Sequence, residues 1–195
     1  MSDENGNMRE RILLEAARLL RRHGYENTTL RDIAKNLEIK AGSIYYHFSS
    51  KEDILIEVLD KGIDNVFLSV KKQMALLSKE ASPRDFLVAA IEGHLRGVFQ
   101  YGDFSSANIR TYRQAPDQAR QAHRKHRKAY SDFWHEIIAN MQDDLRFPED
   151  IETTQRFLMN ALNVTVEWYD WQDDAESFDR FIAVITGNIL NGIVN

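Results

Sequence analysis

Apolar residues recur every three to four positions along most of the chain, which is the spacing of amphipathic helices. Breaks containing Gly, Pro, Ser or Asp separate these segments, and no strand-like alternation interrupts them. The pattern predicts helices over residues 8–23, 30–37, 41–48, 51–78, 83–100, 104–114, 116–141, 149–171 and 174–192. We therefore expect an all-α fold of about nine helices.

The second and third of these segments are short and joined by a tight turn. Thr29 is suited to cap the first, and its apolar stripe is formed by Leu30, Ile33, Ala34 and Leu37. After a turn at residues 38–40, Ile44 and Phe48 lie at i and i+4 and are expected to be buried. Small, hydroxyl and aromatic residues are left on the outer face. A short helix of this kind fits the major groove of DNA, so the segment is predicted to be a helix-turn-helix.

This segment resembles the DNA-binding domain of TetR-family transcriptional regulators. The resemblance rests on Ile33-Ala34, on the run Ile39-Lys40-Ala41-Gly42-Ser43-Ile44-Tyr45-Tyr46-His47-Phe48, and on Lys51-Glu52. It covers about a quarter of the chain and implies a DNA-binding domain at residues 1–50 and a ligand-binding and dimerisation domain at residues 51–195. Lys40 stands where the family often has Ser or Thr. Glu38 stands where the family often has a turn glycine, which makes the turn costlier if it needs a positive φ.

The outer face of the second short helix supplies the candidate DNA contacts. The resemblance implies phosphate contacts from Lys40, Tyr45, His47 and Lys51, and positions near base edges for Ala41, Gly42, Ser43 and Tyr46. Thr29, at the helix start, belongs to the same candidate set. No Arg, Asn or Gln is present for a bidentate base contact, so we expect sequence preference to depend on backbone geometry and contacts to thymine methyl groups.

Charge is distributed unevenly along a chain whose net charge is −5. Residues 9–51 carry nine Lys and Arg against five Asp and Glu, whereas residues 143–180 carry eleven carboxylates against three Arg. The net negative charge argues against a protein that coats nucleic acid indiscriminately, and a basic end suits a regulator that touches DNA there. The chain has no cysteine, signal peptide or apolar run that could span a bilayer, so we expect a cytoplasmic protein without a membrane partner.

Residues 120–128 form the densest basic run. Three interpretations stay open at this point: a solvated helix face, a second nucleic-acid site, or a mouth for an anionic group such as a carboxylate or the phosphates of CoA. His123 and His126 have the i, i+3 spacing of metal ligands, but the cationic setting and the lack of cysteine argue against a metal. We expect neither a metal nor a cofactor.

The C-terminal part is rich in aromatic residues, and the resemblance implies that its middle helices enclose a small-molecule pocket. The segments 162–169 and 182–187 are similar to TetR members that repress lipid or steroid catabolism and respond to CoA thioesters. An apolar effector with an acidic end, such as an acyl-CoA, is therefore expected. The candidate ligand-binding residues are His94, Phe99, Arg110, Tyr112, Arg124, Tyr130, Trp134 and Trp168.

The last two helices carry a broad apolar face, and the resemblance implies that they pair with their copies as a four-helix bundle. The candidate interface residues are Phe178, Ile182, Ile185 and Ile189. These features together predict a homodimeric repressor that binds a pseudo-palindromic operator, with its two DNA-binding domains roughly 34–36 Å apart. A small ligand is expected to release it from DNA. The alternative is a small-molecule or lipid carrier whose N-terminal module is only a scaffold. An enzyme is not expected, because no nucleophile elbow, glycine-rich phosphate loop or metal-ligand spacing occurs.

Overall fold

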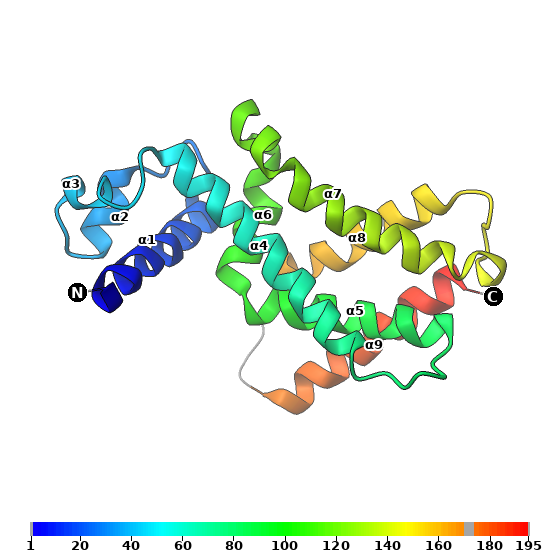
Figure 1. Ribbon diagram of the computed structural model, residues 1–195. Coiled ribbons are helices and arrows are strands. Elements are labelled where there is room, and N and C mark those ends of the chain that lie inside the picture. The colour runs from blue at the N-terminus through cyan, green and yellow to red at the C-terminus, as the bar shows by residue number, and fades with distance from the viewer. Residues whose placement is uncertain (1, 170–173, 195) are drawn as a thin grey trace. The chain divides into compact units, whose positions relative to one another are not determined.

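The computed structural model describes residues 2–169 and 174–194, and this part of the chain contains nine α-helices and two short 3-10 helices (Figure 1). The all-α prediction is thereby confirmed, and the predicted end of one helix at residue 171 lies outside the described residues. None of the described helices is long and apolar enough to cross a membrane. The α-helices are α1 (Ser2–His23), α2 (Leu30–Asn36), α3 (Ala41–Ile44), α4 (Lys51–Met74), α5 (Pro83–Gln100), α6 (Gly102–Thr111), α7 (Asp117–Ala139), α8 (Ile151–Trp168) and α9 (Ala175–Ile193).

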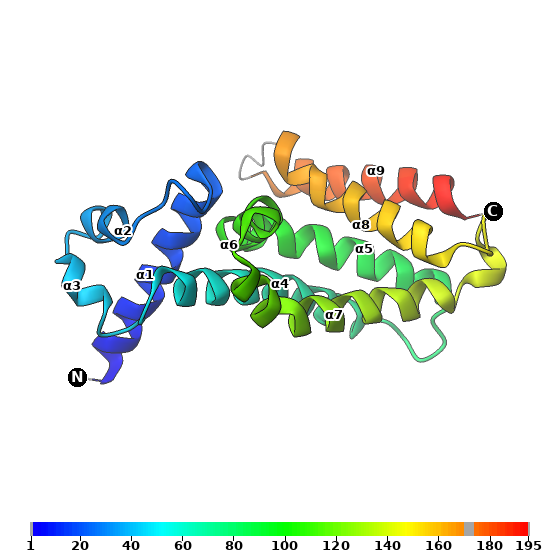
Figure 2. The same cartoon turned by 90° about the horizontal axis from the view of Figure 1, so that it is seen from above.

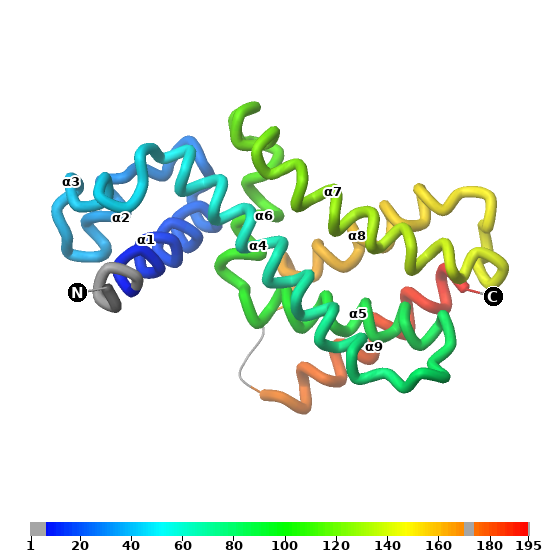
Figure 3. Tube along the Cα trace, in the orientation of Figure 1, coloured from blue at the N-terminus to red at the C-terminus, as the bar shows by residue number. Residues whose placement is uncertain are grey.

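The chain divides into two compact units, each described here by itself. The first comprises residues 1–64 and 101–127, and the second comprises residues 65–100 and 128–195. Helices α4 and α7 each contribute residues to both units. The course of the chain through these helices can be followed in Figure 3. The first unit holds more of the chain than the proposed DNA-binding domain of residues 1–50, which as a functional division stays a prediction.

The first unit is built on the apolar faces of α1, α2, α3, α6 and the first half of α4. Ile12, Leu13, Ile33, Ile44 and Leu55 are all at most 1% exposed and belong to one core cluster. Burial of such side chains stabilises a fold by roughly 1.5–3 kcal/mol each. The short helices α2 and α3 therefore keep their places through packing, since helices of their length are not stable alone.

Helix α2 begins with a reciprocal capping box, as the sequence predicted for Thr29. The Thr29 hydroxyl accepts from the backbone N–H of Asp32 at 3.2 Å, and the Asp32 carboxylate accepts from the Thr29 backbone N–H at 3.1 Å. The hydrogen bonds from Thr29 also lower the pKa of Asp32. The cap fixes the residue at which the helix starts.

The turn between α2 and α3 contains a residue in the left-handed region. Glu38 has φ of +57°, and the following Ile39 N–H donates to Ala34 O at 3.0 Å. A side chain with a Cβ adopts this conformation at a cost, which glycine avoids. The expectation that Glu38 makes this turn costlier is therefore supported by its backbone geometry.

Helices α4 and α6 approach each other closely at Gly62. A Cβ at this position would lie 2.6 Å from Phe104 O and 2.8 Å from Asn108 Cβ, so only glycine fits without movement of the helices. Beside it, the Asn108 side-chain amide donates to Leu59 O at 2.7 Å. The two contacts join the backbone of α4 to α6.

In the second unit, α5 lies between the C-terminal half of α4 and α9 (Figure 2). Gly93 and Gly97 permit the close approach to α4, because a Cβ at either position would lie within 3 Å of the Cα of Val70 or Val66. On the other side, Arg96 of α5 pairs with Asp179 of α9 at 2.6 Å. Helix α5 is thereby held on two sides.

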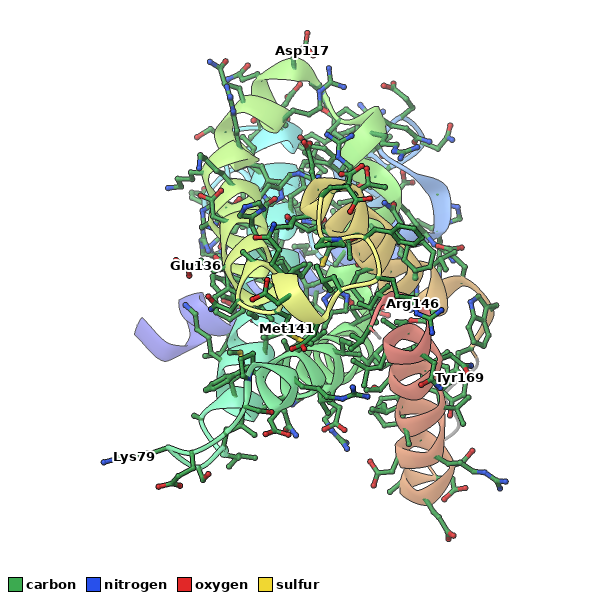
Figure 4. All side chains as sticks on the ribbon, turned by 90° about the vertical axis from the view of Figure 1, so that its right-hand side faces the viewer. Lys79, Asp117, Glu136, Met141, Arg146 and Tyr169 are labelled. Carbon is green, nitrogen blue, oxygen red and sulfur yellow. The ribbon has the colours of Figure 1, made fainter. Side chains whose placement is uncertain are left out.

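The segment after α7 returns to the end of α9. Arg146 lies beside the C-terminal end of α9 (Figure 4), where its backbone N–H donates to Ile193 O at 3.0 Å and its Nε donates to Val194 O at 3.0 Å. Leu145 and Val194 also form an isolated antiparallel bridge. These bonds satisfy carbonyl groups that a helix end otherwise leaves free.

Substitution of Gly62 by Ala tests the close approach of α4 and α6. We expect a loss of about 1–3 kcal/mol in the free energy of unfolding, because the new methyl group meets backbone of α6. Urea denaturation measures it. Gly102→Ala in the same unit is the control, since nothing lies within 4 Å of its Cβ position. Equal stability of the two variants would contradict the close packing.

Substitution of Glu38 by Gly tests the backbone of the turn. We expect the free energy of unfolding to rise by up to about 1 kcal/mol, because glycine removes the left-handed strain and gives back part of the gain through its greater freedom in the unfolded chain. Glu38→Ala is the matched control, since it removes the carboxylate and keeps the Cβ. A gain in both variants would show that charge, not backbone conformation, limits this turn.

Candidate nucleic-acid interface and ligand-binding residues

Helix α3 ends at Ile44, so the helix predicted over residues 41–48 is shorter than expected, and Tyr45, Tyr46 and His47 form a turn after it. This segment turns an apolar side to the core and an aromatic side to solvent. Ile44 is fully buried and Phe48 is 5% exposed, as predicted, whereas Tyr45 is 61% and Tyr46 is 88% exposed. Two large aromatic rings side by side on a surface are typical of a site that a partner covers. The arrangement presents two tyrosines in the turn after α3, while Ile44 and Phe48 anchor this segment in the core.

The other candidate DNA contacts lie along the same short segment. Lys40 and Gly42 are exposed, while Ala41, Ser43 and His47 are partly exposed. Nothing lies within 4 Å of the Cβ position of Gly42, so its outward side is open. Thr29, in contrast, directs its hydroxyl into the capping box of α2. The structure therefore brings the predicted set together, with Thr29 occupied in a local role.

Lys51 is also engaged within the first unit. Its Nζ donates to Tyr25 O at 2.7 Å and lies 4.0 Å from the centre of the Tyr25 ring. Burial, together with a hydrogen bond to Glu52, raises the pKa of Tyr25 to about 12. The ammonium group has three N–H donors, so the bond to Tyr25 positions Lys51 and leaves donors for a phosphate.

Three of the predicted ligand-binding residues meet in the interior of the second unit. His94 of α5 is 1% exposed, Tyr130 of α7 is 5% exposed and Trp134 of α7 is fully buried. His94 Nδ1 and the Tyr130 hydroxyl share a hydrogen bond of 2.7 Å, and the Trp134 ring packs edge-on against both rings. Burial lowers the pKa of His94 to about 4, which the side chain of Asn163 opposes, so the imidazole is neutral at neutral pH.

Two further predicted residues belong to an aromatic cluster of the same unit. Phe99 packs edge-on against Phe178 and Phe181, and Trp168 packs against Phe181 with ring centres 5.7 Å apart. Tyr169, which lies beside α9 (Figure 4), stacks on Phe181 at 3.7 Å. Trp168 remains 58% exposed, so this cluster extends from the core to the surface.

The remaining three candidates lie in the first unit. Arg110 donates to Arg21 O at 3.3 Å, and Arg124 is exposed. The Cζ atom of Arg127 lies 3.9 Å from the centre of the Tyr112 ring. The structure therefore does not gather all eight predicted ligand-binding residues within one unit. The assignment of these three to a ligand stays a prediction.

The histidines of the basic run have a role that sequence reasoning missed. His123 is fully buried, its Nδ1 lies 2.6 Å from Asp60 Oδ1, and its Nε2 lies 3.2 Å from the amide nitrogen of Asn108. His126 bonds Asp64 at 2.7 Å, and the two imidazoles stack with an interplanar angle of 7°. Helical spacing places His123 on the same side of α7 as the buried Ala119, Tyr130 and Trp134, and this spacing could have predicted its burial. Among the described residues, no group of three or more His, Cys, Asp and Glu side chains is placed to hold a metal ion.

The predicted dimer residues face the interior of the chain. Phe178, Ile182 and Ile189 are at most 7% exposed, and Ile185 is partly exposed. The outward side of α9 carries Ala183 and Val184 instead. On α8, an apolar stripe that sequence reasoning missed lies at i, i+4, i+7 and i+11 and consists of Phe157, Ala161, Val164 and Trp168. The helical spacing of these residues could have predicted the stripe. Part of the stripe lines an open groove on α8.

Comparison with known proteins agrees with this architecture. Residues 12–58 match the family of bacterial regulatory proteins called tetR, and residues 80–172 match the tetracyclin repressor-like C-terminal domain. Among solved structures, the ketosteroid transcriptional regulator KstR2 of Mycobacterium tuberculosis has a TM-score of 0.78 at 22% identity and covers 96% of this chain and 95% of its own. AibR, solved with isovaleryl coenzyme A and operator DNA, has a TM-score of 0.79 at 21% identity and covers 92% of this chain and 96% of its own. At these identities the structures show a shared fold.

Sequence relatives carry the assignment further. The transcriptional repressor KstR2 of Mycobacterium tuberculosis is 30% identical over 175 residues, which cover 84% of this chain and 82% of the relative. The repressor of the same name from Mycolicibacterium smegmatis is 28% identical over 193 residues, covering 93% of this chain and 90% of the relative. Together with the exposed tyrosines that follow α3 and the helical C-terminal unit, these matches show that the chain belongs to the TetR family of transcriptional regulators.

Proposed function

We propose that this TetR-family repressor is a homodimer that binds a pseudo-palindromic operator and that an apolar CoA thioester, bound in the second unit, releases it. For a ligand to release DNA, it must favour a form of the dimer in which the two DNA-binding domains no longer match the spacing of the operator half-sites. Membership of the family makes the chain a DNA-binding regulator rather than an enzyme or a carrier.

The pair of exposed tyrosines directly after α3 is the observation that carries the proposal. Ile44 and Phe48 anchor this segment in the core, so Tyr45 and Tyr46 can meet DNA without loss of core packing. Within the proposed contact set, the roles divide between phosphates and base edges as the family resemblance implies. The set is Thr29, Lys40, Ala41, Gly42, Ser43, Tyr45, Tyr46, His47 and Lys51.

The effector class is supported by the character of the second unit and by the relatives. Its buried aromatic residues, with His94 among them, suit an apolar acyl group. A solved relative is described as a ketosteroid regulator, and AibR was solved with a CoA thioester. For this chain, we assign the acyl group to His94, Phe99, Tyr130, Trp134 and Trp168.

A second copy of the chain is the proposed partner of the stripe on α8. Phe157 is 57%, Val164 is 50% and Trp168 is 58% exposed, and Val184 on α9 is 53% exposed. Gly187 has no atom within 4 Å of its Cβ position, which allows another helix to come close. A two-fold interface presents the same surface twice, and a flat apolar face with small residues suits that symmetry.

Operator binding tests the DNA face. Purified protein is titrated into DNA selected from random sequences and into its own upstream region, with fluorescence anisotropy at fixed salt. We expect specific binding that weakens as salt rises, and a loss of about tenfold or more for Tyr46→Ala, because one base contact contributes roughly 1–3 kcal/mol. Phe147→Ala is the control, since Phe147 is a 63% exposed aromatic outside this face. Binding without sequence preference would contradict the proposal.

The same assay tests the effector when acyl-CoA thioesters are added to the preformed complex. Release by a thioester, but not by free CoA or by the free acid, is the expected result. Thermal shift of the protein alone then reports binding, since a ligand of the folded state at a hundredfold excess over its dissociation constant stabilises by about 2.7 kcal/mol. No shift and no release across short, long and ring-containing acyl groups would overturn the effector class.

Substitution of Ala161 by Glu tests the proposed interface on α8. A charge buried against the second copy is unfavourable, so we expect the dimer to dissociate in sedimentation experiments at micromolar concentration. Ala129→Glu is the matched control, because it places the same side chain on the exposed side of α7. A dimer that persists in the Ala161 variant would exclude α8 from the interface.

A further inference from the structure

The fully buried imidazole of His123 lies between a carboxylate and an amide from two other helices of the first unit. Its Nδ1 lies 2.6 Å from Asp60 Oδ1 of α4, and its Nε2 lies 3.2 Å from the side-chain nitrogen of Asn108 on α6. The same Asn108 nitrogen lies 2.7 Å from Leu59 O, a backbone carbonyl that can only accept. The backbone of α4 therefore fixes which way the amide points, with its NH2 group toward Leu59 O and toward the imidazole.

The orientation of this amide determines where the imidazole carries its proton. An NH2 group can only donate, so His123 Nε2 accepts from Asn108 and has no proton of its own. The single proton of the neutral ring is then on Nδ1, which donates it to Asp60. A second proton on Nε2 would point one N–H group at another. The folded network therefore accommodates one proton on His123 and not two.

The neighbouring His126 has the opposite surroundings. Its Nδ1 lies 2.7 Å from Asp64 Oδ1 and its Nε2 lies 3.5 Å from Asp60 Oδ2, so both ring nitrogens face carboxylates. A protonated imidazole donates from both nitrogens, and such a pair of carboxylates suits it. The side chain is also 21% exposed, whereas that of His123 is fully buried. The two stacked histidines therefore differ in how the fold receives a second proton.

The other groups around His123 do not relieve this conflict. The Tyr112 ring lies 5.8 Å from the imidazole, centre to centre, and the Arg127 Cζ atom lies 3.9 Å from the centre of the Tyr112 ring, so a positive charge is already near. The charged residues of α4 and α6 that bond α1 instead are Glu57, Lys61, Asp103 and Arg110. A second proton on His123 therefore has to be accommodated by Asp60 and Asn108.

We propose that His123 and Asn108 form a proton-operated switch between α6 and α4. When the pH falls through the range in which histidine takes up a proton, Nε2 gains an N–H, the Asn108 amide turns over, and its Oδ1 accepts from Nε2. The amide oxygen then faces Leu59 O in place of the NH2 group, so the hydrogen bond from α6 to the backbone of α4 is lost. Asp60 bonds the imidazole in both states.

The switch is expected to act on DNA binding through α4. This helix begins at Lys51, directly after the segment that presents Tyr45 and Tyr46. Loss of the bond from Asn108 removes one constraint on α4, and a less ordered contact surface binds more weakly. Acid therefore lowers operator affinity by an expected three- to tenfold, about what one hydrogen bond contributes. The inference goes beyond the proposed effector and does not depend on it.

NMR of the wild-type protein, labelled with 15N, tests the proton positions without DNA or effector. At about pH 8, His123 Nδ1 is expected to be protonated and Nε2 unprotonated. On acidification to about pH 5, Nε2 should gain a proton, and the side-chain amide signals of Asn108 should shift over the same pH range. A protonated Nε2 at the start, or Asn108 signals that stay unchanged while His123 titrates, would overturn the switch.

Variants of the two switch residues test its effect on the operator. His123→Gln holds the neutral arrangement, because its amide has a donor for Asp60 and an acceptor for Asn108 and takes up no proton. Asn108→Asp favours the acid arrangement, because its carboxylate accepts from a protonated Nε2 and cannot donate to Leu59 O. Fluorescence anisotropy with selected operator DNA, at fixed salt and from about pH 8 to about pH 5, measures each dissociation constant.

The wild-type protein is expected to lose affinity in acid, His123→Gln to keep it, and Asn108→Asp to bind weakly already at about pH 8. His126→Gln is the matched control, because it removes the neighbouring imidazole and leaves the switch intact. His47 of the proposed DNA face is present in every variant, so its own protonation cancels in the comparison. If Asn108→Asp does not fold, the wild-type protein and His123→Gln decide the result by themselves.

The outcomes separate this inference from the proposed function. An equal response to pH in the wild-type protein and in His123→Gln would overturn the switch and leave operator binding standing. Loss of the pH response in His126→Gln, with its retention in His123→Gln, would overturn it as well, because the other histidine would then be the sensor. Absence of sequence-specific DNA binding at every pH would overturn the proposed function, and the NMR titration would still decide whether the switch exists.

Discussion

The buried imidazole of His123 holds together three helices of the first unit. It joins α7 to Asp60 of α4 and to Asn108 of α6, while Asn108 also bonds the α4 backbone at Leu59 O. Gly62 allows α6 to reach this part of α4 at all. Because a fully buried polar side chain is costly unless it is bonded, each partner constrains the others. The segment of α4 that leads to the DNA-binding helices is thus fixed by one polar network.

The first unit also connects α6 to α1. Asp103 pairs with Arg18 at 3.1 Å and with Arg21 at 3.2 Å, and these groups are partly exposed. Exposed ion pairs contribute little to stability, so their main effect is to orient the two helices. Helix α6 therefore contacts both α1 and α4 within the first unit.

The buried histidine of the second unit has different surroundings from that of the first. In the first unit His123 bonds a carboxylate and an amide from two other helices, whereas His94 in the second unit shares a hydrogen bond of 2.7 Å with the aromatic Tyr130. The first arrangement suits a structural role, because nothing is left for a ligand to satisfy. The second places an imidazole among aromatic side chains, which is the usual composition of a small-molecule site.

Much of the architecture follows from local sequence. Helical spacing, the capping box of Thr29 and Asp32, and the short α3 with buried Ile44 are properties of neighbouring residues, and the structure confirms them. The sequence by itself therefore determined the all-α fold, the cap of α2 and the family. The helix predicted over residues 41–48 ends at Ile44 instead. It did not determine which side of α9 faces the core, or that His123 would be buried in a basic run. Both depend on contacts between helices that are far apart in the chain. A helix with several apolar sides buries only the sides that neighbouring helices cover, and only tertiary packing decides which sides these are.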